Sequence, residues 1–150
     1  MSQDNPTDPA ELREAALRLL ARREHSRLEL TRKLTRRGWA ASDIDPVVDE
    51  LAAENLQSDE RFAEGYVRQR AAKAYGPVRI RGELSERGID ASQAARAMEA
   101  ESPDWLAIAA DWYERRYGAQ APIDLKEKSR RQQALARRGF AHEHIRELID

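Results

Sequence analysis

The side chains in this sequence with the clearest capacity for chemistry are basic, and they gather in three segments. Segment 27–38 contains five bases and one acid, segment 68–88 six bases and two acids, and segment 126–138 six bases and one acid. Arginine outnumbers lysine 22 to 4, and its planar guanidinium group suits bidentate binding of carboxylate or phosphate. The segments predict an anion-binding surface, although ion pairs along solvated helix faces account for them equally well.

Residues that could catalyse a reaction or hold a metal do not form a recognisable site. The histidines are His25, His142 and His144, and the last two are two positions apart, so on a helix their rings point in different directions. The sequence has no cysteine, no phosphate-binding loop and no nucleophile elbow, and its carboxylates lack a partner base. We therefore expect a protein that is not an enzyme and that holds no metal or cofactor.

The elements that must position the basic segments are predicted to be helices. Of the 150 residues, 25 are Ala and 14 are Leu, whereas Val, Ile and Thr together number 14. Ala, Leu, Arg and Glu favour helices, and branched side chains favour strands. No stretch of the chain alternates polar and apolar residues with period two, which a half-buried strand would require. The composition predicts an all-α fold.

Each basic segment ends in the same six-residue pattern, which we call the stop pattern. Its three copies are LTRRGW, LSERGI and LARRGF, with the glycines at Gly38, Gly88 and Gly139, 50 and 51 residues apart. Glycine adopts the left-handed conformation at low cost and commonly ends a helix. The pattern predicts a Schellman motif, in which the leucine contacts the apolar residue after the glycine.

One apolar helical stretch precedes each basic segment and another follows it, so we expect three helices in each of three repeats. The predicted limits are 10–57, 58–101 and 102–150, after a flexible N-terminal tail at 1–9. A unit of this size buries little apolar surface alone, so the repeats should stack into an elongated, curved body. Repetition would bring the basic middle helices to one side of the stack.

The chain shows no segment that would take it into or across a membrane. The longest uninterrupted apolar run, residues 105–110, is six residues, whereas a bilayer span needs about 20. The N-terminus lacks the basic and then apolar order of a signal peptide. Together with the absence of cysteine, this predicts a cytoplasmic protein without membrane partners.

Two stretches of the second repeat resemble the RecX family of bacterial recombination regulators. Residues 56–63 read LQSDERFA, and residues 76–90 read GPVRIRGELSERGID. The other repeats fit the family in the expected order, apart from a longer connection at 118–125. The resemblance implies three tandem three-helix repeats and a non-catalytic regulator that binds the RecA filament on single-stranded DNA. Such a regulator inhibits extension of the filament and lowers its recombinase, ATPase and co-protease activities, which modulates DNA repair and the SOS response.

The candidate partner-binding residues lie in the basic segment of the second repeat. They are Arg68, Arg70, Lys73, Arg79, Arg81, Glu83 and Arg87. Arg79, Glu83 and Arg87 match polar positions of the family motif and share one helix face at a spacing of four. An internal ion-pair ladder explains these three equally well. The remaining four are predicted to face solvent.

A second interpretation is a nucleic-acid-binding protein in its own right. Three-helix units with a glycine turn resemble helix-turn-helix modules, which place one helix in the major groove. That reading predicts tight duplex binding without RecA, whereas the regulator reading predicts only weak direct DNA contact. For an elongated regulator we expect a monomer.

Overall fold

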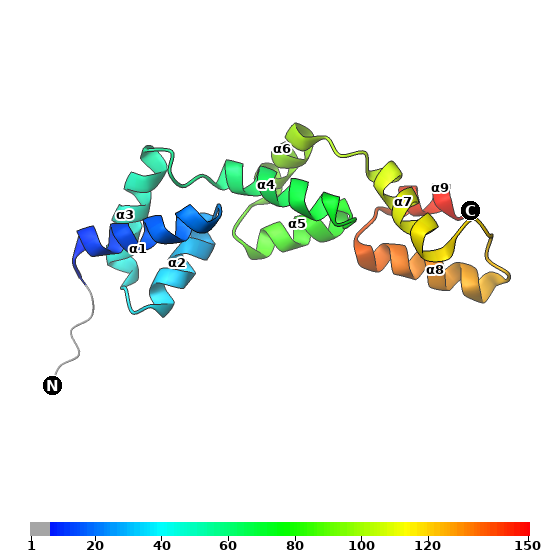
Figure 1. Cartoon of the computed structure of the whole chain (residues 1–150), viewed down its shortest axis with the longest axis horizontal. Helices are drawn as coiled ribbons and strands as arrows, with labels where there is room; N and C mark the ends of the chain where they lie inside the picture. The colour runs from blue at the N-terminus through cyan, green and yellow to red at the C-terminus, as the bar shows by residue number, and fades with distance from the viewer. Residues whose placement is uncertain (1–6) are drawn as a thin grey trace.

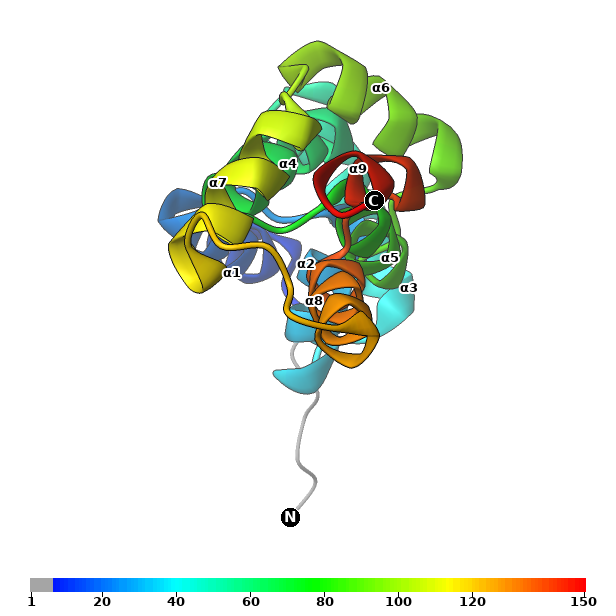
Figure 2. The same cartoon turned by 90° about the vertical axis from the view of Figure 1, so that its right-hand side faces the viewer.

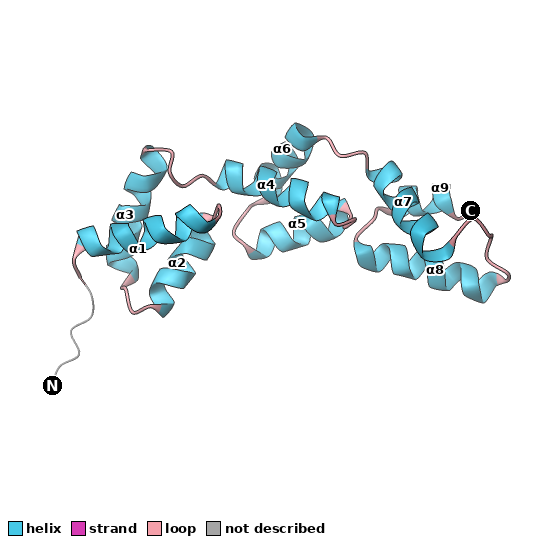
Figure 3. Ribbon diagram, viewed as in Figure 1, coloured by secondary structure: helices cyan, strands magenta, loops and turns pink. Residues whose placement is uncertain are grey.

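The computed structural model describes residues 7–150, and all regular structure in this range is helical, as the composition predicted (Figure 3). In chain order the helices are α1 (Pro9–Arg22), α2 (Arg27–Arg36), α3 (Ala41–Ala53), α4 (Asp59–Ala72), α5 (Pro77–Glu86), α6 (Ala91–Glu101), α7 (Trp105–Tyr117), α8 (Leu125–Arg138) and α9 (His142–Leu148). No helix in this part of the chain is both long enough and apolar enough to cross a bilayer.

The helices group in threes around three separate apolar cores, and the groups form an elongated, shallowly curved row (Figure 1). We call the groups unit 1 (α1–α3), unit 2 (α4–α6) and unit 3 (α7–α9). Each core contains both apolar residues of its stop pattern. These pairs are Leu34 with Trp39, Leu84 with Ile89, and Leu135 with Phe140.

The first helix begins inside the stretch that the sequence assigned to a tail. Pro9 is the first residue of α1, and the Asp8 side chain accepts a hydrogen bond from the Ala10 amide at 3.0 Å. Proline suits this position because the first helical amide has no partner within the helix, and the cap satisfies one of the others. The rest of the predicted tail, residues 1–6, lies outside the described residues.

The stop patterns end the second helix of each unit as predicted. Their three glycines have φ between 82° and 100°. In unit 1 the Trp39 amide donates to the Leu34 carbonyl at 3.2 Å, and the Gly38 amide donates to the Thr35 carbonyl at 3.0 Å. The same two bonds recur in units 2 and 3. This pair of bonds defines the Schellman motif, so that prediction is confirmed.

The second helices α2, α5 and α8 lie end to end along one side of the molecule (Figures 1 and 2). The C-terminal end of α8 meets the start of α5, and the C-terminal end of α5 meets the start of α2. Where α8 meets α5, the Gly76 amide donates to the Arg138 carbonyl at 2.8 Å, and the Val78 amide donates to the Gly139 carbonyl at 2.9 Å. Amides at a helix start and carbonyls at a helix end lack partners within their own helices. The junction pairs these groups and aligns the two helix dipoles head to tail.

The end of α5 also lies against the start of α2, through a close packing contact. A Cβ placed on Gly88 would lie only 2.8 Å from the Cβ of Leu28, so the two units can come this close because residue 88 is a glycine. Beside this contact, the Arg27 amide donates to the Asp59 carboxylate at 2.8 Å. Asp59 is the first residue of α4, so it both starts a helix and ties unit 2 to unit 1.

Gly139→Ala tests the close contact between units 2 and 3. Its φ is 97°, and an added Cβ would lie 2.2 Å from the Cβ of Arg79. Because the left-handed conformation alone costs a non-glycine residue about 1–2 kcal/mol, we expect urea denaturation to show a free energy of unfolding lowered by about 2 kcal/mol or more. Gly82→Ala is the control: it lies within α5 with no atom within 4 Å of an added Cβ, and should raise stability by roughly 0.5–1 kcal/mol. Equal stability of Gly139→Ala and the native protein would contradict this account of the junction.

Candidate functional site

The end-to-end helices carry a group of exposed cations that we call the cationic edge. Its members lie on α2, α5 or α8, at the C-terminal end of α2, or beside the junction of α8 with α5. None of them has a carboxylate within ion-pair distance in residues 7–150. They are Arg32, Arg36, Arg37, Lys73, Arg81, Lys126 and Arg137. An uncompensated row of cations attracts an anionic partner more strongly than one whose charge is already paired.

Two of the predicted partner-binding residues belong to this edge. Arg81 lies on α5 and Lys73 caps the end of α4, and both are exposed. Lys73 is close to the junction of units 2 and 3, because the guanidinium group of Arg138 donates to its carbonyl oxygen. These two side chains are available to a partner.

Arg70 does not face solvent, so that prediction is wrong. Its side chain is 19% exposed and makes a bidentate ion pair with Glu83, with Nε and Nη2 at 2.9 and 2.8 Å from the carboxylate oxygens. The guanidinium carbon also lies 3.8 Å from the centre of the Tyr75 ring. Arg70 and Glu83 come from different helices, so local spacing does not reveal their pairing.

Glu83 gathers the polar contacts within unit 2. In addition to Arg70, it accepts hydrogen bonds from the Tyr66 hydroxyl at 3.0 Å and from Arg79 Nε at 3.2 Å. Burial would raise the pKa of the Glu83 carboxyl, but the hydrogen bonds from Arg70, Tyr66 and Arg79 outweigh it and lower this pKa below its ordinary 4.5. Burial and the bond to Glu83 also raise the pKa of Tyr66. The carboxylate is therefore fully occupied within the fold.

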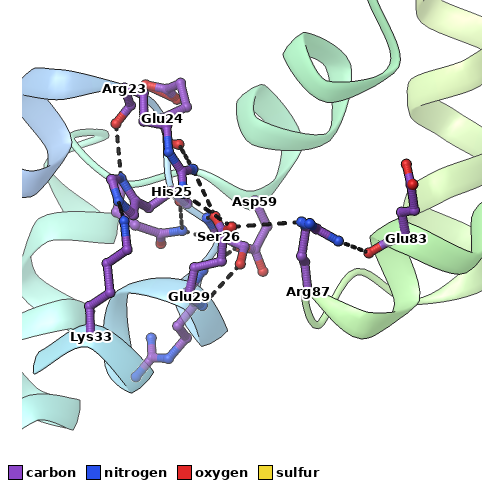
Figure 4. Close-up of polar contacts among 11 residues, drawn as sticks. Arg23, Glu24, His25, Ser26, Glu29, Lys33, Asp59, Glu83 and Arg87 are labelled. Atoms are coloured by element: carbon purple, nitrogen blue, oxygen red, sulfur yellow. Dashed lines mark hydrogen bonds and ion pairs between the residues drawn. The ribbon is translucent and has the colours of Figure 1, made fainter. Parts of the chain in front are cut away.

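Only half of the alternative ladder along α5 forms. Arg79 reaches the Glu83 carboxylate, whereas Arg87 donates to the Glu83 backbone oxygen at 2.9 Å. The other side of the Arg87 guanidinium faces unit 1, with Nε 3.8 Å from the Glu29 carboxylate (Figure 4). Arg87 therefore links two units.

Arg68 is exposed as predicted but paired. Its Nε and Nη2 lie 2.8 and 3.0 Å from the two carboxylate oxygens of Glu101. This bidentate pair joins α4 to α6, and its hydrogen bonds lower the pKa of the Glu101 carboxyl. A partner would have to compete with Glu101 for this arginine.

The junction of units 2 and 3 contains an arginine cluster that the sequence did not predict. Arg70, Arg79 and Arg138 have their guanidinium carbons 3.8, 4.6 and 3.9 Å from the centre of the Tyr75 ring. Arg138 also donates to the Ala74 carbonyl at 3.0 Å. Guanidinium groups stack well on aromatic rings, so a single tyrosine holds cations from both units together. The only sequence signal was the arginine that precedes the glycine in every stop pattern.

Glu83→Gln tests the role of this carboxylate in the fold. Without it the half-buried Arg70 loses its charged partner, and we expect the free energy of unfolding to fall by about 1–3 kcal/mol. Because the Glu83 pKa is lowered in the folded state, its contribution is complete above pH 4.5 and is lost as the pH falls through the folded-state value. The free energy of unfolding of the variant should therefore change less with pH below 4.5 than that of the native protein. The matched control is the exposed Glu86→Gln, expected to change stability by at most about 0.5 kcal/mol; equal effects of the two changes would refute a special role for Glu83.

The three units correspond to three known domains. Residues 13–51, 58–98 and 103–149 match the family models of the first, second and third three-helix domains of RecX, respectively. Each matched span overlaps the three helices of one unit and no helix of another unit. The order of the matches along the chain is the order of the domains in the family.

Whole-chain similarity agrees with the domain matches. The chain is 47% identical over 135 residues to the regulatory protein RecX of Halorhodospira halophila, covering 90% of this chain and 84% of that protein. It is 40% identical over 141 residues to the regulatory protein RecX of Pseudomonas entomophila, covering 94% and 91%. The crystal structure of RecX from Lactobacillus salivarius superimposes with a TM-score of 0.78 at 25% identity, covering 94% of both chains. The chain belongs to the RecX family of regulatory proteins.

Proposed function

We propose that this chain binds the RecA filament on single-stranded DNA and limits its extension, lowering the recombinase, ATPase and co-protease activities of the filament. Membership of a family of regulatory proteins supports this role. The observation that carries the proposal is the end-to-end alignment of α2, α5 and α8 (Figure 1), together with the exposed cations of the cationic edge, which have no ion pair within residues 7–150. In that role the protein is a non-catalytic, cytoplasmic regulator of DNA repair and the SOS response.

An elongated row of units suits a filament as its partner. Successive units of the row can contact successive protomers of a helical polymer, so contacts that are weak individually combine through a high effective concentration. The net charge of the whole chain is −1, so its cations act locally rather than as a general attraction to polyanions. A regulator of this kind discriminates filament from bulk duplex DNA.

Direct insertion into duplex DNA is less well supported. The start of α5 is occupied by carbonyls from the end of α8, whereas recognition helices contact bases through their N-terminal residues. The third helix of unit 1, α3, carries acids and no base. The acids are Asp43, Asp45, Asp49 and Glu50. Such a helix would repel the phosphates that line the groove.

The hydrolysis of ATP by RecA on single-stranded DNA tests the proposal directly. Added at a small fraction of the RecA concentration, the protein should progressively slow hydrolysis, because one molecule that stops extension affects many protomers. A rate that stays constant throughout a long assay would contradict the proposal. Tight duplex binding in the absence of RecA would instead favour the nucleic-acid-binding alternative.

A charge-reversal variant tests whether the cationic edge makes the contact. Lys73→Glu combined with Arg81→Glu changes two exposed side chains that make no ion pair with any residue from 7 to 150. We expect at least tenfold more protein to be needed for half-maximal inhibition, which corresponds to the loss of about 1.4 kcal/mol or more of binding free energy.

The matched control is Arg18→Glu combined with Arg115→Glu, which changes the net charge equally. Arg18 lies on α1 and Arg115 on α7, away from the cationic edge, and each is exposed with an acid one turn before it. This variant should inhibit like the native protein. If the Lys73/Arg81 variant keeps its helicity and inhibits as well as the native protein, this part of the cationic edge does not make the contact with the filament.

A further inference from the structure

The arginine before the glycine of each stop pattern has a different environment in unit 1 than in units 2 and 3. Arg87 lies 3.8 Å from the Glu29 carboxylate of unit 1, and Arg138 donates to the carbonyl oxygens of Lys73 and Ala74 in unit 2. Each thus meets oxygen acceptors of the preceding unit. Arg37 occupies the same position in unit 1, is exposed, and has no such acceptor in the described part of the chain.

Arg37 lines a cavity of about 450 Å³ between the end of α1 and the second half of α2. The lining residues are Leu19, Arg22, Arg23, His25, Lys33, Arg36 and Arg37. Five of these seven are basic, and within residues 7–150 only Arg23 has a carboxylate partner, Glu29 at 3.0 Å. The cavity therefore concentrates positive charge that the fold does not neutralise.

The buried side chain of His25 positions Lys33, one of these cations. His25 is 1% exposed, and its Nδ1 lies 3.0 Å from the Arg23 carbonyl oxygen while its Nε2 lies 2.8 Å from Lys33 Nζ (Figure 4). Burial lowers the pKa of His25, so the neutral ring donates from Nδ1 and accepts from the Lys33 ammonium at Nε2. Burial, followed by the nearby Arg23, also lowers the pKa of Lys33. These shifts agree with a crowded cationic site.

We propose that this cavity binds phosphate groups of the backbone of single-stranded nucleic acid. Guanidinium groups match the oxygen geometry of phosphate, and Arg22, Arg36 and Arg37 are available for it. None of the lining residues is Phe, Tyr or Trp, and the ring of His25 is buried between the Arg23 carbonyl and Lys33, so no ring is open for a base to stack on. The site therefore recognises backbone rather than sequence. This goes beyond the proposed function, because it requires no RecA.

The hydrogen-bonding character of the lining favours a nucleic-acid strand over an acidic peptide. Its basic side chains are donors only, and the acceptor nitrogen of His25 is occupied by Lys33. A phosphodiester backbone brings acceptors alone, whereas a peptide also brings amide donors that would find no side-chain partner in the cavity. An adjoining groove shares Lys33 and Arg36 and adds Arg32, so cations continue beyond the cavity. Glu29, Glu86 and Arg87 complete the lining of this groove, and Arg87 lies within ion-pair distance of both acids.

Arg36→Gln combined with Arg37→Gln tests the site, with fluorescence anisotropy of a labelled oligothymidylate as the measurement. We expect the dissociation constant to rise about tenfold and the slope of log affinity against log salt to become shallower by about 1.4, which is 0.7 for each lost contact with a single strand. Arg18→Gln with Arg115→Gln removes the same charge outside the cavity and should leave both quantities unchanged. Arg22→Gln, which approaches the cavity from α1, provides a second test should the double variant lose its helical circular dichroism.

The competing outcomes are distinct. Equal weakening by the cavity and control variants, or no weakening by the cavity variants, would overturn the site. Polyglutamate that displaces the strand at a matched concentration of charge would identify an acidic peptide as the ligand instead, and inorganic phosphate that does so would identify a site for the free ion. These measurements do not contain RecA. A negative result would therefore overturn the cavity as a binding site, while inhibition of the filament is tested separately by the hydrolysis of ATP.

Discussion

The left-handed glycine at the end of each second helix is the constraint on which the rest of the structure depends. It turns the chain so that the next apolar residue enters the core of its own unit, as Trp39 does beneath Leu34. It also leaves the end of the helix without a Cβ, so that a neighbouring unit can approach. At Gly139 the backbone of unit 3 comes close enough to α5 for the two helices to share hydrogen bonds. Glycine thus closes each unit, and at Gly88 and Gly139 it also lets neighbouring units meet.

The arginines that make the sequence look basic divide into two structural classes. Some are paired within the fold, as Arg70 is with Glu83. Arg131 is another: it is 8% exposed and donates to the Tyr113 hydroxyl, the Gln120 carbonyl and Glu127. Others, such as Arg36 and Arg81, are exposed and have no ion pair in the described residues. Counting bases by segment therefore overstates the charge offered to a partner and misplaces part of it. What remains is concentrated beside α2, α5 and α8.

The same arrangement explains how a nearly neutral chain can present a charged surface. Helix α3 of unit 1 carries four acids and no base, and it packs against α1 and α2 through its apolar side. Ion pairs such as Arg27 with Asp49 tie the start of α2 to α3, while the cations near the end of α2 have no acid partner in the described part of the chain. Segregation of charge along the row of units, rather than net charge, gives this protein a side suited to an anionic partner.

Local spacing in the sequence was sufficient for the helices, the three stop patterns and the threefold repeat, because each depends on residues within one or two turns of one another. The tertiary structure decided which arginines are paired within the fold and which have no ion pair in the described residues. Arg70 meets Glu83 and Tyr75 because α4 folds back against α5, and Arg138 reaches Ala74 because α8 ends where α5 begins. These contacts depend on the angles between helices, which follow from the packing of whole units and leave no periodic trace in the chain. The sequence by itself determined the repeating unit and its helix ends; the way the units meet determined which charges remain for a partner.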